Sequence, residues 1–296
     1  MEENKTNRER GILMVATSHA YYGRLAYNLA STIKGVEDFP IAIVRDDKSL
    51  THLSIAQRSV FDIEIPLPEK ASGGFTPKLY INELSPFKQT LYLDVDMLWL
   101  PFRTPTQLFD ELKDCDYTGI TEGWYDITTD NHTNERKDYY FWADLKEILT
   151  TYNLTEGIMY QWRSEVIYFN KTEQINKFFK DCQEIHANPR LKTIRKFGEH
   201  VPDELSINIS SAINEIDPHR VKWTPAYWHK LHQDRVPQIG ELQQWYLLSF
   251  GSNHSLPSVK RLYDKVTSIS LKKQGRQHVF GLHSKKEFMS VERNKI

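Results

Sequence analysis

The sequence is poor in cysteine, carries almost no net charge and has no long apolar run. Its two cysteines, Cys115 and Cys182, lie far apart without the spacing of a metal site, which favours reduced thiols and a cytoplasmic location. The apolar run at residues 12–16 is too short for a signal peptide or a membrane span, so we expect neither export nor a transmembrane segment. The formal charge of -1 argues against a protein that coats nucleic acid, although it leaves local patches open.

The composition is that of an ordinary globular protein, because 40% of the 296 residues are hydrophobic and 12% are aromatic. A chain of this length can fill the core of one large α/β domain or of two small ones. We find no repeat, no low-complexity tract and no long Pro/Gly linker, so we expect a single domain over residues 1–296.

Strand-like and helix-like segments alternate in the first half of the chain, which is typical of a parallel sheet wound with helices. The expected strands are residues 11–17, 40–44, 61–65 and 90–93, and the expected helices are residues 21–33 and a segment that Pro77 opens. In the second half only a strand at residues 166–170 and a helix at residues 172–187 are clear. The fold class is therefore α/β with an irregular second half.

Two aspartates close the strand expected at residues 90–93, in the triplet Asp94-Val95-Asp96. Open α/β folds bind ligands at the edge where their strands end. Two carboxylates at that edge suit a divalent cation that also holds phosphate oxygens. The similar triplet at residues 114–116 lies between a helical segment and a strand, where turn or capping roles are more natural.

Residues 122–162 are polar and contain far more aromatic side chains than a simple connection needs. One interpretation is a loop-and-helix excursion that serves as a lid or an acceptor platform, since aromatic faces pack against sugars, bases and peptides. The alternative is that these side chains only pack the excursion onto the sheet.

Two blocks of the sequence resemble nucleotide-sugar glycosyltransferases of the GT-A fold, and most closely the glycogenin-like group called glycosyltransferase family 8. The first block is the strand and loop at residues 15–21, and the second runs from Phe75 to Leu100, where a lysine-led helix enters a Tyr-Leu-Asp-x-Asp strand. The resemblance implies a Rossmann-like, mostly parallel central sheet flanked by helices. It also implies a donor-binding half at about residues 11–121 and an acceptor-side half at about residues 122–296.

The same two blocks imply most of the donor site. In the family the first loop holds the base and ribose of the nucleotide, so the resemblance assigns backbone and hydroxyl contacts there and a base contact to Tyr21. A lysine at position 78 can place a point charge near the diphosphate or ribose; the alternative is a solvated helix lysine. The implied donor-binding residues are Ala16, Thr17, Ser18, Tyr21, Lys78, Asp94, Val95 and Lys285, and the implied metal ligands are Asp94, Asp96 and a histidine.

Three later blocks complete the resemblance. Residues 163–165 replace the Asn-x-Gly turn of the family, which puts its sugar and acceptor contacts in doubt and leaves Arg163 and Glu165 as acceptor-side candidates. Asp203 and Glu204 match an acidic or amide pair under the transferred sugar and are the catalytic candidates. Asp203 could equally be the N-cap of a helix, with Glu204 in its first turn.

Residues 278–286 look like the histidine-glycine-lysine motif that completes the metal site and clamps the diphosphate in the family. We favour His283 over the alternative His278 as the metal ligand. A histidine at the end of a buried strand beside Lys285 would put ligand and clamp at one sheet edge.

The resemblance implies a hexosyl- or pentosyltransferase that depends on Mn²⁺ (or Mg²⁺) and moves a sugar, with retention, from a nucleotide-sugar donor, most simply a UDP-sugar. The acceptor is not readable and could be a glycan, a protein or a nucleic acid such as DNA. The basic stretch at residues 260–295 fits a phosphate-rich acceptor, a membrane surface, a lipid-linked glycan or a solvated helix face. Two alternatives remain open: a sugar-phosphate nucleotidyltransferase, against which the single glycine at residues 18–23 counts, and a sugar-nucleotide-binding protein without turnover.

Overall fold

The computed structural model describes residues 8–133, 141–218, 223–228, 237–250 and 257–274. Its main sheet has seven strands in the order β3-β2-β1-β4-β8-β6-β7, and a second sheet has three strands in the order β5-β10-β9. The chain divides into two compact units. Unit 1 comprises Met1–Arg10, Leu67–Tyr92 and Asp114–Trp223, and unit 2 comprises Gly11–Pro66, Leu93–Lys113 and Thr224–Ile296.

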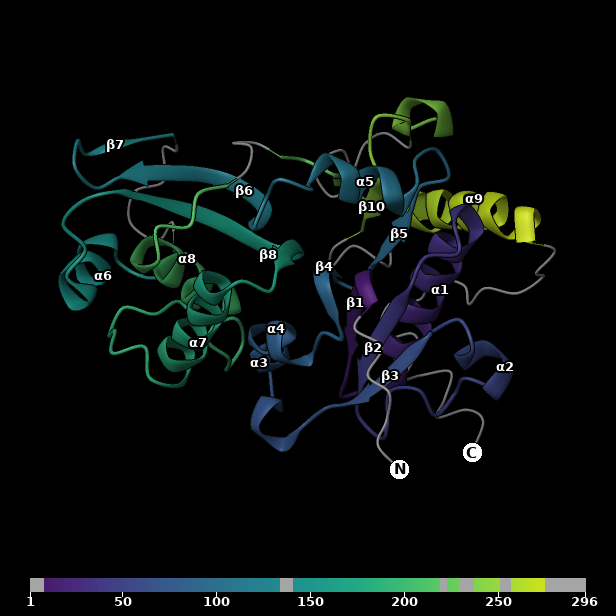
Figure 1. The fold of residues 1–296 in the computed structure, drawn as a ribbon, viewed down its shortest axis with the longest axis horizontal. Helices are drawn as coiled ribbons and strands as arrows, with labels where there is room; N and C mark the ends of the chain where they lie inside the picture. The colour runs from purple at the N-terminus through teal and green to yellow at the C-terminus, as the bar shows by residue number, and fades with distance from the viewer. Residues whose placement is uncertain (1–7, 134–140, 219–222, 229–236, 251–256, 275–296) are drawn as a thin grey trace. The chain divides into compact units, whose positions relative to one another are not determined.

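Unit 2 begins with three parallel strands connected through helices. β1 (Arg8–Ala16) is followed by α1 (Ala20–Val36), β2 (Ile41–Arg45), α2 (Ile55–Arg58) and β3 (Ile63–Pro66). β1 pairs with β2 and β2 pairs with β3, both in parallel (Figure 1). The register places Ala16 beside Arg45 and Arg45 beside Pro66, so the loops that follow these strands leave the sheet at one edge.

The described part of unit 2 has six further elements, two of which pack on α1. The additional elements are β5 (Met97–Trp99), α5 (Pro105–Glu111), β9 (Ala226–Trp228), η3 (Ile239–Leu242), β10 (Leu247–Ser249) and α9 (Pro257–Gln274). α1 contacts both α9 and β5, and most of its residues are buried. The backbone N–H of Trp99 donates to the Thr32 hydroxyl at 2.9 Å, so a buried polar group of α1 is satisfied by the neighbouring strand.

Unit 1 contains most of β4 and the remaining helices. Its elements are η1 (Glu69–Ala71), α3 (Thr76–Leu79), α4 (Ile81–Leu84), β4 (Phe87–Leu93), β6 (Tyr117–Asp126), β7 (Asn131–His132), α6 (Leu145–Tyr152), β8 (Ile158–Asn170), α7 (Glu173–Ala187) and α8 (Asp203–Ile213). α8 packs on β8 and on α7. The buried Trp162 of β8 ties these layers together, because its backbone N–H donates to Asn208 Oδ1 and its indole N–H donates to Ser211 Oγ, both at 2.9 Å.

The aromatic-rich stretch at residues 122–162 differs from the excursion expected from the sequence. Both of its ends are strand, because β6 runs on to Asp126 and pairs antiparallel with β8, which begins at Ile158 (Figure 1). Phe141 and Trp162 are buried in unit 1, being at most 1% exposed. For these two side chains the packing interpretation is therefore the correct one.

The expected α/β fold class is confirmed, with a central sheet whose first strands are parallel and helices that flank it. The strands and helices expected in the first half of the chain are present, with ends shifted by a few residues. Among the helices in the described part of the chain, none has both the length and the apolar character needed to cross a bilayer. The single-domain organisation over residues 1–296 stays a prediction.

Candidate functional site

The triplet Asp94-Val95-Asp96 directly follows β4 and precedes β5, as expected. Val95 is buried, with 7% of its surface exposed, whereas the aspartates on either side are partly exposed. The main-chain carbonyl of Asp96 accepts a hydrogen bond from the N–H of Phe250 at 3.3 Å. A buried anchor between two accessible carboxylates therefore holds the acidic pair at the end of a strand of the main sheet.

These two carboxylates have the chemistry that Mn²⁺ or Mg²⁺ requires, because both ions prefer oxygen ligands and keep positions for phosphate oxygens. Within the described ranges, no three His, Cys, Asp or Glu side chains group closely enough to hold a metal ion. The further ligand expected at His283 or His278, and the expected clamp Lys285, lie outside the described residues. The metal-binding roles stay predictions.

The second triplet, Asp114-Cys115-Asp116, occupies the turn between α5 and β6, as expected. Both of its aspartates are exposed, and Asp116 Oδ1 accepts a hydrogen bond from Asn170 Nδ2 at 3.2 Å. This contact gives Asp116 a structural role at the end of β8, and the triplet provides a natural control for experiments on the first one.

The expected nucleotide-side residues Ala16, Thr17 and Ser18 lie at the end of β1 and in the loop that leads to α1. Ala16 is the buried last residue of β1, and Ser18 is exposed with a left-handed backbone, at φ 74°. Next along the chain, His19 caps α1, because its Nδ1 accepts a hydrogen bond from the N–H of Tyr21 at 3.0 Å. The loop therefore turns sharply within three residues.

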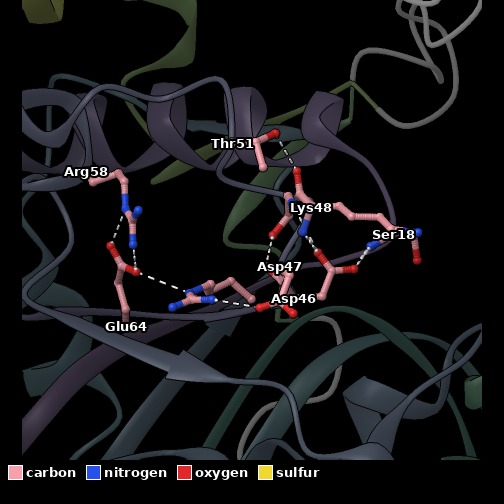
Figure 2. Close-up of polar contacts among 9 residues, drawn as sticks. Ser18, Asp46, Asp47, Lys48, Thr51, Arg58 and Glu64 are labelled. Atoms are coloured by element: carbon pink, nitrogen blue, oxygen red, sulfur yellow. Dashed lines mark hydrogen bonds and ion pairs between the residues drawn. The ribbon is translucent and has the colours of Figure 1, made fainter.

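A carboxylate from the next strand end holds this turn in place. Asp46, directly after β2, accepts a hydrogen bond on Oδ2 from the Ser18 N–H at 2.5 Å, and on Oδ1 from the Lys48 and Ser49 N–H groups at 3.0 and 2.8 Å. Figure 2 shows Asp46 reaching across to Ser18, with Asp47 and Lys48 in the same loop. Burial acts to raise the pKa of Asp46, but the three N–H groups outweigh it and lower the pKa below its ordinary value, so the carboxylate is ionised at neutral pH.

The first turns of α1 pack closely on the same loop. A Cβ added to Gly23 would lie 1.9 Å from the Ser49 carbonyl oxygen, so this position requires glycine. Tyr21, expected at the nucleotide base, is only 4% exposed, and its ring lies edge-on to the Tyr22 ring with centroids 5.5 Å apart. Its contact with a base stays a prediction.

Unit 1 brings together several of the other expected site residues. Lys78, in α3, donates from Nζ to Ser164 Oγ at 3.2 Å and lies 3.9 Å from Asp203 Oδ2. The Lys78 side chain is 17% exposed and that of Asp203 is 5% exposed, so the solvated interpretation of this lysine does not hold. A cation, a hydroxyl and a carboxylate from α3, β8 and α8 therefore meet at one point.

Glu204 is held on both oxygens by a neighbouring part of this cluster. Its Oε2 accepts a hydrogen bond from the Trp142 indole N–H at 2.6 Å, and its Oε1 lies 3.3 Å from Arg163 Nη1. Arg163 Nη2 also pairs with Glu122 Oε1 at 2.6 Å. Burial raises the pKa of Glu204 and the charge of Asp203 adds to the effect, whereas Arg163 and Trp142 oppose it.

The pKa of Arg163 moves in the direction that favours its charge. Burial alone would lower it, but the negative charges of Glu204, Glu122 and Glu165 outweigh burial and raise the pKa. The Arg163 guanidinium is therefore a permanent cation between Glu122 and Glu204.

Asp203 and Glu204 are the first two residues of α8, and Pro202 occupies the N-cap position without a side-chain hydrogen bond. The alternative that Asp203 is itself the N-cap is therefore wrong, although both carboxylates lie in the first turn, where the helix dipole favours negative charge. Asp203 Oδ2 is buried and accepts no hydrogen bond from any described residue. Of the two catalytic candidates, Asp203 thus has the oxygen with remaining capacity to accept a hydrogen bond.

Residues 163–165 form part of a continuous strand, β8, and make no tight turn. Ile120 pairs with Arg163 while Gly119 pairs with Ile167, so residues 164–166 are extra on β8 and form a bulge. The bulge directs Ser164 to Lys78. A bulge that re-aims a side chain is a common device beside active sites.

Three residues with evident roles in these clusters were missed by the sequence analysis: Asp46, Glu122 and Trp142. Asp46 was within reach, because it lies two residues after the strand predicted at residues 40–44, at the edge where ligands bind. Glu122 and Trp142 contact residues 41 and 62 positions away, and no local pattern indicates such pairs.

Comparison with known proteins identifies solved structures that share the fold of this chain. No protein-family model matches the chain, and no curated protein matches its sequence. Among solved structures, the galactosyltransferase LgtC, in complex with donor and acceptor sugar analogues, matches 88% of this chain and 95% of its own with a TM-score of 0.52 and 12% identity. The chain therefore has a GT-A glycosyltransferase fold. The bifunctional glycosyltransferase WbbM matches 92% of this chain with a TM-score of 0.54 and 11% identity, and this chain spans 52% of WbbM. The narrower resemblance to glycosyltransferase family 8 stays a prediction.

Proposed function

We propose that this protein is a metal-dependent glycosyltransferase that moves a sugar from a nucleotide-diphosphate sugar, a UDP-sugar in the simplest case, to an acceptor. The observation that carries the proposal is the acidic pair Asp94 and Asp96, which flanks a buried Val95 at a strand end in a GT-A fold. The LgtC structure with this fold contains a donor sugar analogue, which supports the same use of the fold here.

In the proposal, unit 2 holds the nucleotide and the cation. Asp96 and Asp94 would bind Mn²⁺ or Mg²⁺ together with a C-terminal histidine, His283 or His278, and a bound cation would neutralise charge on the departing diphosphate. The loop fixed by Asp46 would present Thr17 and Ser18 to the base and ribose, and this contact needs a defined backbone conformation. The left-handed Ser18 and its hydrogen bond to Asp46 supply such a conformation.

The cluster in unit 1 fits the sugar side of the reaction. Cleavage of a glycosidic bond develops positive charge at the anomeric carbon, which a nearby carboxylate stabilises. Asp203 has a buried oxygen that accepts no hydrogen bond from the described residues, whereas Glu204 is engaged on both oxygens. We therefore assign the charge-stabilising role to Asp203, with Glu204 as its fixed neighbour and Lys78 as the cation beside it. Retention at the anomeric carbon is part of the proposal.

The nucleotidyltransferase alternative is disfavoured by the β1–α1 connection. That class uses a glycine-rich loop whose N–H groups surround phosphates, but here the connection is only residues 17–19 and contains no glycine. The other alternative, a nucleotide-sugar-binding protein without turnover, differs from the proposal only in the absence of reaction.

The proposal is tested by incubating the pure protein with Mn²⁺ and a panel of nucleotide sugars, and by following release of nucleoside diphosphate. We expect slow, metal-dependent release from one donor, with loss of release in Asp96→Asn. Asp114→Asn, a change of the same type at an exposed aspartate of the second triplet, should leave the rate unchanged. Pyrophosphate chemistry would indicate a nucleotidyltransferase, and tight binding without release would indicate a binding protein.

A further inference from the structure

The segment between α7 and α8 is strongly cationic and exposed. Over residues 188–200 it contains four cationic side chains, Arg190, Lys192, Arg195 and Lys196, and a single acid, Glu199. All five are exposed, whereas the whole chain has a formal charge of -1. We call residues 188–200 the cationic loop.

The backbone of the cationic loop is fixed by contacts with α6. Glu147 accepts hydrogen bonds from the Lys192 N–H at 2.8 Å, the Thr193 N–H at 3.1 Å and the Thr193 hydroxyl at 2.6 Å. The Tyr152 hydroxyl donates to the Pro189 carbonyl at 2.5 Å. Because these bonds already order the backbone, a ligand that binds the cations need not order the loop first.

The loop also exposes an aromatic face. Phe197 is 63% exposed, and its ring lies edge-on to that of Phe75 with centroids 5.9 Å apart. Two backbone hydrogen bonds between Phe197 and His200, at 2.9 and 3.2 Å, hold this part of the loop in a tight turn. Gly74 permits the close approach, because a Cβ there would lie 2.7 Å from the His200 ring.

The cationic loop adjoins the Lys78–Asp203 cluster at two points within unit 1. Phe75, which Phe197 contacts, is the N-cap of the helix α3 that carries Lys78. At the same, C-terminal end the loop continues through Val201 and Pro202 into Asp203 at the start of α8. Lys78 and Asp203 are themselves 3.9 Å apart, so the C-terminal end of the loop adjoins the sugar side of the proposed site.

We infer that the cationic loop binds a glycan acceptor that carries anionic groups, phosphate or carboxylate, with Phe197 against the apolar face of a sugar ring. The inference rests on the proposed function and names the acceptor class. Arg and Lys side chains bind phosphate and carboxylate, and aromatic faces pack on sugar rings. A long nucleic acid fits less well, because the patch contains only a few cations on a chain that is nearly neutral overall.

The test measures binding of the full-length protein to three immobilised oligosaccharides of equal length: a phosphorylated pentamannose, the same sugar without phosphate, and an oligogalacturonate. We expect at least one anionic oligosaccharide to bind about ten-fold tighter than the neutral one, and the difference to shrink with salt. Tighter binding of the phosphorylated pentamannose indicates a preference for phosphate, and tighter binding of the oligogalacturonate indicates a preference for carboxylate.

Variants assign the binding to the loop. Lys192→Gln combined with Lys196→Gln should weaken binding of the anionic oligosaccharide about ten-fold, and Phe197→Ala should weaken it about five-fold. The same neutralisation at two other exposed lysines, Lys113→Gln with Lys180→Gln, should change nothing. Equal affinity for charged and neutral sugars, or an unaffected loop variant, would overturn the inference, as would tighter binding of a 20-nucleotide single-stranded DNA.

The same samples are titrated with a panel of nucleoside diphosphates, UDP among them, in the presence of Mn²⁺ to separate this inference from the proposed function. A protein that binds the anionic oligosaccharide through the loop but binds no nucleoside diphosphate supports the oligosaccharide-binding loop and contradicts the glycosyltransferase. A protein that binds UDP but none of the three oligosaccharides contradicts the inference about the cationic loop and leaves the proposed function intact.

Discussion

Replacing Asp46 by alanine should weaken nucleotide binding without touching any residue that the sequence assigns to the nucleotide. The Asp46 carboxylate accepts the Ser18 N–H at 2.5 Å and two further backbone N–H groups of its own loop. Without it, nothing described on the β2 side of the loop holds Ser18 at φ 74°. We therefore expect the β1–α1 loop to relax in Asp46→Ala, while the sheet remains intact.

The expected magnitude follows from the conformation of Ser18. A left-handed conformation disfavours a residue with a Cβ by about 1–2 kcal/mol, and this penalty would fall on nucleotide binding once the carboxylate is gone. A penalty of about 1 kcal/mol weakens affinity about five-fold. Loss of the carboxylate as a cap of its own loop should also lower the free energy of unfolding by about 1 kcal/mol.

A second substitution separates this reasoning from a general loss of charge. Glycine adopts positive φ without a steric penalty, so in a Ser18→Gly background Asp46→Ala should weaken UDP affinity less than about two-fold. Asp47→Ala is the matched control, because Asp47 is fully exposed and, among the described residues, pairs with Arg45 at 3.5 Å. The assay is calorimetric titration of UDP in the presence of Mn²⁺. An unchanged affinity in Asp46→Ala, or an equal loss in both backgrounds, would refute the reasoning.

Three further predictions concern stability. Arg163→Met should lower the free energy of unfolding in urea by about 2–3 kcal/mol, because it leaves the buried Glu204 without the paired Arg163 cation. Adding Glu204→Gln should recover at least half of the lost stability. An Arg163→Met protein as stable as the wild type would contradict this. Gly23→Ala should cost about 2–3 kcal/mol because its Cβ would meet a carbonyl oxygen, whereas Gly240→Ala, with its nearest atom at 3.8 Å, should change stability by less than about 0.5 kcal/mol. Burial lowers the pKa of His186 below 6.5, so folding stability should fall as the pH drops below that value. In thermal unfolding, the stability of His186→Gln should fall less steeply with decreasing pH than that of the wild type. An identical pH profile in the two proteins would show that His186 is not the cause.

β2 of unit 2 could be read from the sequence because residues 41–44 are a short apolar run that is buried on both faces. The full length of β8 could not, because its first half contains the partly exposed Gln161, Arg163 and Glu165. Gln161 and Arg163 lie in a strand because β6 pairs with them, and Glu165 lies in the bulge that follows. Pairing between strands about 40 residues apart is a long-range interaction that local apolar periodicity does not report.

In the candidate site, too, local features could be predicted from the sequence and long-range contacts could not. The acidic pair at the end of β4 was predictable, since strand end and residue type are both local features. The engagement of Glu204 by Trp142 and Arg163 was not, because these contacts join residues 62 and 41 positions apart. The structure therefore distinguishes the two catalytic candidates: Asp203 has a carboxylate oxygen that can still accept a hydrogen bond, whereas both oxygens of Glu204 are already engaged.

The most direct test of the central claim is the dependence of UDP affinity on Mn²⁺ in the wild type, Asp96→Asn and Asp114→Asn proteins. If Asp94 and Asp96 hold a cation that binds the diphosphate, Mn²⁺ should tighten UDP binding in the wild type and in Asp114→Asn by at least about ten-fold. In Asp96→Asn that enhancement should disappear while the fold, followed by circular dichroism, is unchanged. An Mn²⁺ enhancement that survives Asp96→Asn, or that is lost equally in Asp114→Asn, would contradict the account.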